Sequence, residues 1–220
     1  MIESRDHCIR CGECCLKASP TLQKEDLGLY KSGFIKYEAL YTVRQGELVR
    51  DNIKEELVVT PTELIKVKEK DEGKGSCCFY DEDGKGCTVY SHRPVQCAVL
   101  KCWDTSELIE VQQGRKLVRK DIIKDETLLG IIAEHEKRCS YALLEKYVKQ
   151  IESLGEKAVE KILDILKFDY ELRPFMTRKL DLHPKDLDFF FGRPLTETIA
   201  MFGFRIVEEP DGSFLFTTLE

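Results

Sequence analysis

The feature that most limits how this chain can fold is a run of four cysteines near its start. Cys8, Cys11, Cys14 and Cys15 are spaced as C-x2-C-x2-C-C. Thiolates are soft donors that suit zinc, Cu(I) and iron–sulfur clusters, and ordinary packing does not explain four of them within eight residues. The spacing therefore predicts a metal site at this end of the chain.

Six further cysteines and the composition narrow the kind of protein. The six are Cys77, Cys78, Cys87, Cys97, Cys102 and Cys139. The N-terminus lacks the basic and apolar segments of a secretion signal, and no apolar run approaches the ~20 residues of a membrane span. We therefore expect a cytoplasmic protein with reduced thiols. A net charge of -6 argues against nucleic acid, so the expected partner is a metal ion or cluster, with any protein partner unknown.

The N-terminal spacing has a local structural meaning. Two cysteines spaced C-x2-C bind one metal because the turn between them points both sulfurs inward. Gly12, directly after Cys11, can take a positive φ and leave its amide to donate to a sulfur. Cys14 and Cys15 are adjacent, so their side chains tend to point in different directions. Either one ligates and the other packs, or the two face neighbouring sites.

A second adjacent pair, Cys77 and Cys78, precedes a predicted hairpin. Residues 78–80 and 88–90 bracket a turn-rich segment with two glycines, which is typical of two paired strands. The hairpin would bring Cys78 near Cys87.

The last cysteines of the first half surround a predicted helix start. Pro94 suits the first turn of a helix, with Ser91 as its cap. The positive end of the helix dipole would then stabilise a thiolate at Cys97. Cys102 stands beside Trp103, an aromatic side chain that would shield a metal site from water.

The composition changes abruptly after the cysteine-rich part, which predicts two domains within an α+β fold. The first, residues 1–104, is a loop-rich, metal-binding cysteine domain with short hairpins. The second, residues 105–220, is mainly helical and ends in a β-hairpin. In the first domain we expect a helix over 22–30 capped by Thr21 and ended by Gly33, a hairpin of 41–43 with 47–49, and a strand over 63–68.

The second domain shows helical periodicity. Apolar residues recur at three and four positions over 128–135, 144–151 and 159–166, which indicates amphipathic helices that face a core. Gly155 separates the last two helices, so they can form a helical hairpin. After residue 168 we expect a mixed tail, with short helices over 184–191 and 194–201 ended by Gly203, and a hairpin of 204–207 with 214–218.

Cys139 stands apart from the other cysteines. His135 lies four residues earlier and shares its helix face. The pair is either a metal-binding arm that reaches from the helical part or a core cysteine beside a half-buried histidine.

Three separated blocks of residues resemble a known family. They are Cys8-x2-Cys11-Gly12-x-Cys14-Cys15, then Cys78-Phe79-Tyr80 to Cys87-Thr88-Val89-Tyr90, then Arg93-Pro94-x2-Cys97. In this order they resemble the YkgJ-type cysteine-cluster family, described as a zinc- or iron-chelating domain with a CxxCxxCC motif. The resemblance covers about residues 8–103, and nothing we recognise covers residues 105–220.

The resemblance implies metal binding and a set of ligands. The ligands would be Cys8, Cys11, Cys14, Cys15, Cys78, Cys87 and Cys97. Cys77, Cys102 and Cys139 lie outside the common pattern and, together with His135, are additional candidate ligands. A related cluster in FliB-type flagellin lysine methylases is thought to carry iron–sulfur.

The hypothesis that follows is a metal-binding protein that holds an iron–sulfur cluster or zinc, with redox or electron-transfer chemistry as an extension. Iron–sulfur is favoured because the core motif has almost no histidine. Cys8, Cys11 and Cys14 match the first three ligands of the C-x2-C-x2-C-x3-C run that binds a 4Fe-4S cluster, and the fourth must come from farther away.

Two alternatives stay open. One is a structural zinc-binding module for protein interaction, and the other is a methyltransferase relative of FliB. The sequence contains no glycine-rich start for a nucleotide or S-adenosylmethionine site and no Ser/His/Asp arrangement that spacing supports. Whether the chain is an enzyme is therefore undecided, and no catalytic residue is assigned.

Overall fold

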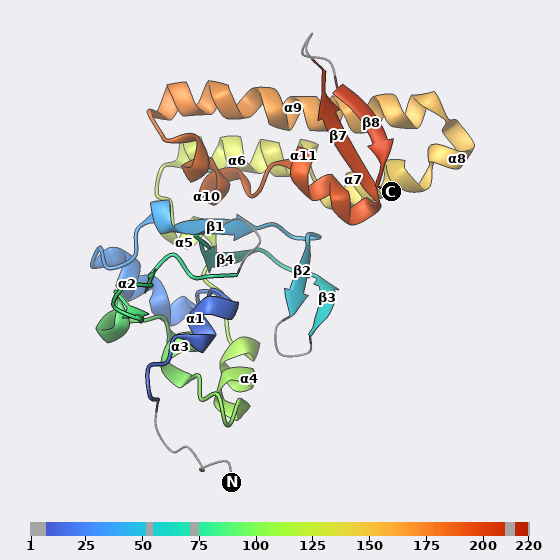
Figure 1. The fold of residues 1–220 in the computed structure, drawn as a ribbon. Helices are drawn as coiled ribbons and strands as arrows, with labels where there is room; N and C mark the ends of the chain where they lie inside the picture. The colour runs from blue at the N-terminus through green and yellow to red at the C-terminus, as the bar shows by residue number, and fades with distance from the viewer. Residues whose placement is uncertain (1–7, 52–54, 71–74, 210–213, 220) are drawn as a thin grey trace. The chain divides into compact units, whose positions relative to one another are not determined.

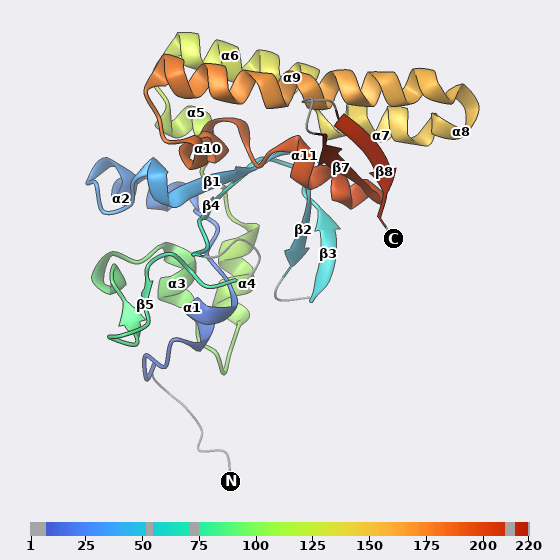
Figure 2. The same ribbon diagram turned by 45° about the horizontal axis from the view of Figure 1, so that its top comes forward.

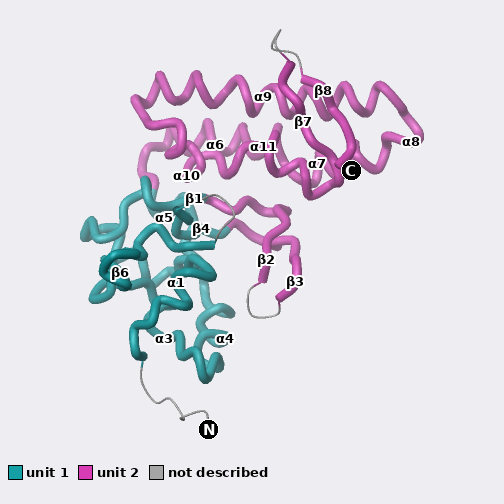
Figure 3. Tube along the Cα trace, viewed as in Figure 1, with its two compact units in different colours: residues 1–41, 64–122 teal, residues 42–63, 123–220 magenta. Residues whose placement is uncertain are grey.

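The chain is described here by a computed structural model that covers residues 8–51, 55–70, 75–209 and 214–219. Helices and short two-stranded sheets make up the fold, so the predicted mixed α+β class is confirmed. The chain divides into two compact units (Figure 3), with residues 1–41 and 64–122 in unit 1 and residues 42–63 and 123–220 in unit 2. Compactness does not test whether a unit folds alone, so the predicted boundary at residue 104 stays a prediction.

Unit 1 is built from short elements (Figure 1). Its helices are α1 (Glu13–Lys17), α2 (Leu27–Lys31), α3 (Val95–Val99), α4 (Ser106–Gln113) and α5 (Arg119–Ile122), with 3-10 turns at Lys24–Asp26, Tyr37–Ala39 and Tyr90–His92. Its strands are β4 (Leu64–Val67), β5 (Tyr80–Asp81), β6 (Gly86–Cys87) and the start of β1 (Leu40–Val43). The predicted strand over 63–68 is confirmed by β4. The apolar core is small, with Leu22, Ile65 and Leu117 among its buried side chains.

The predicted helix over 22–30 exists but begins later. Its first turn starts at Lys24 after Gln23, whose amide donates to the Asp26 carboxylate at 2.7 Å. Thr21 is not the cap, because Gln23 is the residue that precedes the first turn; the amide of Thr21 donates to the Gln96 side chain at 2.8 Å. Gly33 follows the helix with a φ of 75°, and this left-handed conformation ends helices. The predicted terminator is therefore confirmed and the predicted cap is wrong.

The hairpin predicted for 41–43 with 47–49 is also wrong. β2 (Leu48–Asp51) pairs antiparallel with β3 (Glu56–Val59), and Leu48 lies opposite Val59. In the turn before β2, the amide of Arg44 donates to the Glu47 carboxylate at 3.0 Å, and both side chains are buried. A hydrogen bond from a backbone amide to a buried carboxylate therefore closes the turn, and the strand that follows pairs with β3 instead of β1.

Unit 2 is a layer of helices with a terminal hairpin, and α9 lies alongside α6 and α7 in both Figures 1 and 2. Its helices are α6 (Glu126–Arg138), α7 (Tyr141–Lys149), α8 (Ile151–Leu154), α9 (Glu156–Leu180), α10 (Leu187–Phe191) and α11 (Leu195–Thr198), with 3-10 turns at Pro184–Asp186 and Ile199–Phe202. Leu144, Ile162 and Leu166 are fully buried, which confirms the predicted core stripes. Gly155, with a φ of 54°, separates α8 from α9 as predicted.

The end of unit 2 agrees with the prediction except at α9. β7 (Phe204–Glu208) pairs antiparallel with β8 (Phe214–Thr218), as expected. Helix α9, however, continues past residue 168 to Leu180 and includes Pro174. Arg173 Nε lies 3.1 Å from Asp169 Oδ2, so an ion pair stabilises the turn of the helix directly before the proline. Within the described part of the chain, no helix has both the length and the apolar character that a membrane crossing requires.

Candidate metal centre

Six cysteines line one pocket of unit 1. The pocket has a volume of about 310 Å³, and its cysteines are Cys8, Cys11, Cys14, Cys15, Cys87 and Cys102. They come from the N-terminal segment, the hairpin β5–β6 and the turn after α3. Among the other lining residues, Leu100 and Trp103 are apolar, and Trp103 stands at the site as predicted. The fold thus collects thiols that lie far apart in the sequence.

The C-x2-C turn has the backbone conformation that the sequence predicts. Gly12 takes a φ of 79°, and a Cβ built there would lie 2.5 Å from the ring of Tyr80. Glycine is therefore required both for the backbone and for the close approach of the aromatic ring. The N–H that faces a sulfur is that of Arg10, 3.4 Å from Cys8 Sγ, and Arg10 itself has a φ of 56°.

The two members of the doubled cysteine differ in their acidity. The sulfurs of Cys14 and Cys15 are 3.9 Å apart. The contact with Cys15 lowers the pKa of Cys14 to about 6, whereas the same contact raises the pKa of Cys15. Of the two thiols, Cys14 therefore gives up its proton more readily, as a metal ligand must.

The predicted hairpin exists as β5–β6, which pairs Tyr80–Asp81 with Gly86–Cys87 rather than 78–80 with 88–90. Tyr80 lies opposite Cys87, and Cys78 precedes Tyr80 by two residues in the turn that leads into β5. The amide of Cys77 donates to the carbonyl of Cys15 at 2.7 Å, which attaches the base of the hairpin to the N-terminal segment. Cys77 and Cys78 themselves do not line the pocket.

Cys97 is the third residue of α3, which begins directly after Pro94, as predicted. Ser91 is not the cap, because it belongs to the preceding 3-10 turn. Burial raises the pKa of the Cys97 thiol, and the charges of neighbouring thiolates raise it further. The helix dipole that we expected to favour a thiolate at Cys97 is therefore outweighed by burial.

Two cysteines of the family pattern, Cys78 and Cys97, do not line the pocket. The charge of Cys87 is one of the smaller influences on the pKa of Cys15, Cys78 and Cys97.

Two side chains that the sequence analysis missed hold α3 in place. The Asp26 carboxylate accepts the amide of Val95 at 2.8 Å, and Gln96 accepts the amide of Thr21 at 2.8 Å. Burial raises the pKa of Asp26, while its contacts with the amides of Gln23 and Val95 oppose the shift. The spacing Gln23-x-x-Asp26 resembles a capping box and was the one available signal for Asp26.

The thiols surround the pocket without converging on a point. Among the described residues, no three His, Cys, Asp or Glu side chains are arranged to hold a metal ion. The donor chemistry nevertheless fits a soft metal, since thiols predominate among the groups around the pocket that can bind one.

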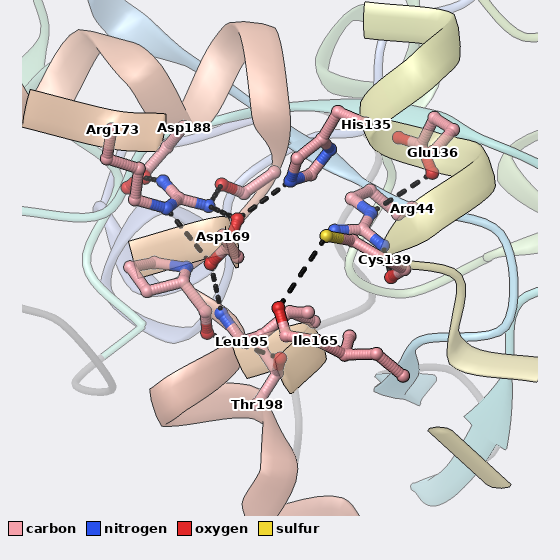
Figure 4. A network of polar contacts seen from close by, with 12 residues as sticks. Arg44, His135, Glu136, Cys139, Ile165, Asp169, Arg173, Asp188, Leu195 and Thr198 are labelled. Atoms are coloured by element: carbon pink, nitrogen blue, oxygen red, sulfur yellow. Dashed lines mark hydrogen bonds and ion pairs between the residues drawn. The ribbon is translucent and has the colours of Figure 1, made fainter. Parts of the chain in front are cut away.

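Cys139 and His135 belong to unit 2 and are buried there (Figure 4). The thiol of Cys139 lies 3.9 Å from the carbonyl of Ile165, and burial raises its pKa to about 12. His135 Nε2 is 2.7 Å from Asp169 Oδ1. Both residues thus have structural contacts within the core of unit 2, and a role for them as metal ligands stays a prediction.

A pocket lined by thiols from separated segments defines a metal-chelating class of protein. Residues 7–117 match the CxxCxxCC family, described as "Putative zinc- or iron-chelating domain". Because the match spans half of the chain, the chain belongs to this family, and the resemblance seen in the sequence is confirmed. Neither the curated proteins nor the solved structures contain a match.

Proposed function

We propose that unit 1 binds an iron–sulfur cluster in the thiol pocket and that the protein uses it in redox or electron-transfer chemistry. The observation that carries the proposal is the pocket of about 310 Å³ with six cysteines on its wall. The ligands come from the seven cysteines of the family pattern: Cys8, Cys11, Cys14, Cys15, Cys78, Cys87 and Cys97.

The shape of the pocket favours a cluster over a single zinc ion. A structural zinc site draws four ligands around one atom at about 2.3 Å for sulfur, which leaves no internal space. Six thiols instead stand around a pocket of about 310 Å³. A group with several metal and sulfide atoms is held by thiolates at its periphery.

The residues of the pocket would prepare it for a cluster, which supplies one-electron transfer when bound. The contact with Cys15 lowers the pKa of Cys14, so this thiol would release its proton to a metal more readily than an ordinary cysteine. Leu100 and Trp103 supply an apolar part of the pocket wall. Trp103 is 38% exposed, so part of its ring faces solvent.

The metal is identified by elemental analysis and an absorbance spectrum on the full chain purified without oxygen. A cluster gives iron and acid-labile sulfide in similar amounts and a broad band near roughly 400 nm. A colourless protein with stoichiometric zinc would overturn the cluster and favour the structural zinc module instead. A protein with neither metal would overturn metal binding altogether.

The convergence of distant cysteines is tested by substitution. Cys11→Ser removes a thiol of the pocket, and Cys97→Ser removes one from α3, so each variant should carry less metal than the unmodified chain. Cys139→Ser is the matched control, because Cys139 is buried in unit 2 and a serine hydroxyl can still donate to the Ile165 carbonyl. A Cys97 variant with full metal content would show that α3 is not part of the site.

A further inference from the structure

One aromatic ring at the thiol pocket holds two arginines. Cζ of Arg10 and Cζ of Arg93 each lie 4.1 Å from the centre of the Tyr90 ring. The two positive charges are therefore no more than about 8 Å apart, a distance at which like charges on a protein repel each other. Arg10 and Tyr90 both line the pocket. The fold thus concentrates positive charge at one part of the pocket wall, and we call Arg10 and Arg93 the arginine pair.

Elsewhere in the chain, an arginine that lies over a ring also has a carboxylate beside it. Arg138 lies 4.7 Å from the centre of the Phe168 ring, and its Nε donates to Glu134 at 2.8 Å. A stacked guanidinium meets the ring with its flat face, so the N–H groups along its edge can still donate. Arg44, which lies over Tyr141, is likewise 3.2 Å from a glutamate. Stacking on a ring and pairing with a carboxylate thus occur together in this protein.

The arginine pair has the ring without the carboxylate. Within the residues that the structure describes, neither Arg10 nor Arg93 forms an ion pair, although Arg93 Nη1 donates to the Tyr90 carbonyl at 3.0 Å. Glu13, the acidic residue on the pocket wall, lies 3.4 Å from Lys17 instead. The arginine pair therefore keeps N–H donors for which the described part of the chain supplies no carboxylate.

Arg10 has an unfavourable backbone conformation at this place. Its φ is 56°, in the left-handed region that glycine and asparagine adopt more readily than arginine. Its amide lies 3.4 Å from Cys8 Sγ, so the conformation belongs to the C-x2-C turn. A long side chain at a position suited to a small one indicates that the guanidinium itself has a use beside the pocket.

From these contacts we infer that Arg10 and Arg93 form a binding site for a small oxyanion, a carboxylate or a phosphate group, at the wall of the thiol pocket. The guanidinium fork matches both groups, because each can accept two parallel hydrogen bonds. A bound anion also relieves the repulsion between the two guanidiniums. The site goes beyond the proposed metal function, and it would place the anionic group of a small ligand beside the metal-binding pocket.

Calorimetric titration of the full chain, as purified, with inorganic phosphate and separately with malonate tests the site. Sodium chloride keeps the ionic strength constant. The net charge of -6 opposes general anion binding, so we expect one site per chain. Arg10→Gln and Arg93→Gln should each weaken binding at least about tenfold. Arg138→Gln is the matched control and should bind like the unmodified chain, because Arg138 is stacked but already has its glutamate. The anion that binds more tightly identifies the ligand group.

Three results would overturn the oxyanion site. One is that neither anion binds at concentrations up to about 10 mM, which already correspond to weak affinity. Another is that Arg138→Gln weakens binding as much as Arg10→Gln. The third is a fall in metal content in Arg10→Gln with unchanged affinity for the anion, which would mean that the arginine pair serves the metal centre instead.

The proposed metal function fails separately. A chain purified without metal would overturn that function, whereas anion binding that is lost in Arg10→Gln would still support the oxyanion site.

Modification of the unmodified chain with phenylglyoxal gives a test that needs no substitution. Mass spectrometry measures the rate at which each arginine reacts. At a phosphate concentration about four times the Kd, mass action leaves about one fifth of the sites free, so Arg10 and Arg93 should react about fivefold more slowly than in chloride of equal ionic strength. Arg138 should react at the same rate in both. Unchanged rates at Arg10 and Arg93, or equal slowing at Arg138, would contradict the site.

Discussion

The two units stabilise their interiors in different ways. Unit 1 has short helices, a small apolar core and nine of the ten cysteines. Unit 2 has the 25-residue helix α9 and an apolar core that extends from Tyr141 to Ile199. From this difference we expect unit 1 to depend on a bound metal for its stability, whereas unit 2 is stabilised by its own contacts.

The same contrast holds for buried polar groups. In unit 2 the fully buried Arg44 faces Glu136 at 3.2 Å, and the buried Asp169 is held by His135 and Arg173 (Figure 4). These charges compensate one another within the unit. The thiols of Cys87 and Cys97 in unit 1 differ: burial, and then the charge of Cys14 among other cysteines, raise their pKa. These thiols therefore keep their protons unless a bound cation balances their charge.

The largest expected effect within unit 2 comes from Arg44→Ala. Removing one partner of a buried ion pair typically costs about 3–5 kcal/mol, and here Glu136 and the carbonyl of Cys139 would lose their donor. Chemical denaturation should show this loss in the free energy of unfolding of unit 2. Arg138→Ala is the control, since Arg138 also pairs with a glutamate but is exposed, and its loss should be below about 1 kcal/mol. Equal losses would mean that the buried network does not stabilise unit 2.

Two glycine-to-alanine variants, one in each unit, should change the stability of the protein in opposite directions. Gly12→Ala forces a side chain into a left-handed backbone and against Tyr80, which should cost about 1–3 kcal/mol and weaken metal retention. Gly130→Ala lies inside α6 with open space around its Cβ, and alanine should stabilise that helix by about 0.5–1 kcal/mol. Thermal melting and metal analysis check both variants. A harmless Gly12→Ala would contradict the tight C-x2-C turn.

The smallest effect concerns the pH dependence of unit 2. Burial lowers the pKa of His135 below its usual 6.5, and the charge of Arg44 lowers it further. The contact with Asp169 opposes these two effects. The unfolded chain therefore binds a proton that folded unit 2 does not, so unit 2 loses stability as the pH falls below about 6.5. Melting of His135→Gln between pH 8 and pH 5 should show a weaker dependence. His183→Gln, at an exposed position, should behave like the unmodified chain.

The sequence predicted local features more successfully than contacts between distant segments. The hairpin at Cys87, the helix start at Pro94 and the stripes of Leu144 and Ile162 follow from turn residues and periodicity, which are local properties. The family match also follows from short spacings.

What the sequence could not give depends on residues far apart. Arg44 in a predicted turn gave no sign that it would be buried, because its partners on α6 lie about ninety residues away. The pairing of β2 with β3 and the continuation of α9 through Pro174 likewise depend on tertiary packing. Cys102 lies outside the family pattern, and only the fold brings it to the pocket.

Amide hydrogen exchange before and after complete metal removal tests the contrast between the units most directly. A structural metal contributes on the order of 10–16 kcal/mol to a small metal-binding fold, more than the short elements of unit 1 supply. We therefore predict that the amides of α3 and of the hairpin β5–β6 lose their protection after chelation, while those of α9 keep it. Unchanged protection of α3 in metal-free protein would contradict the account, because unit 1 would then be stable without its ligand.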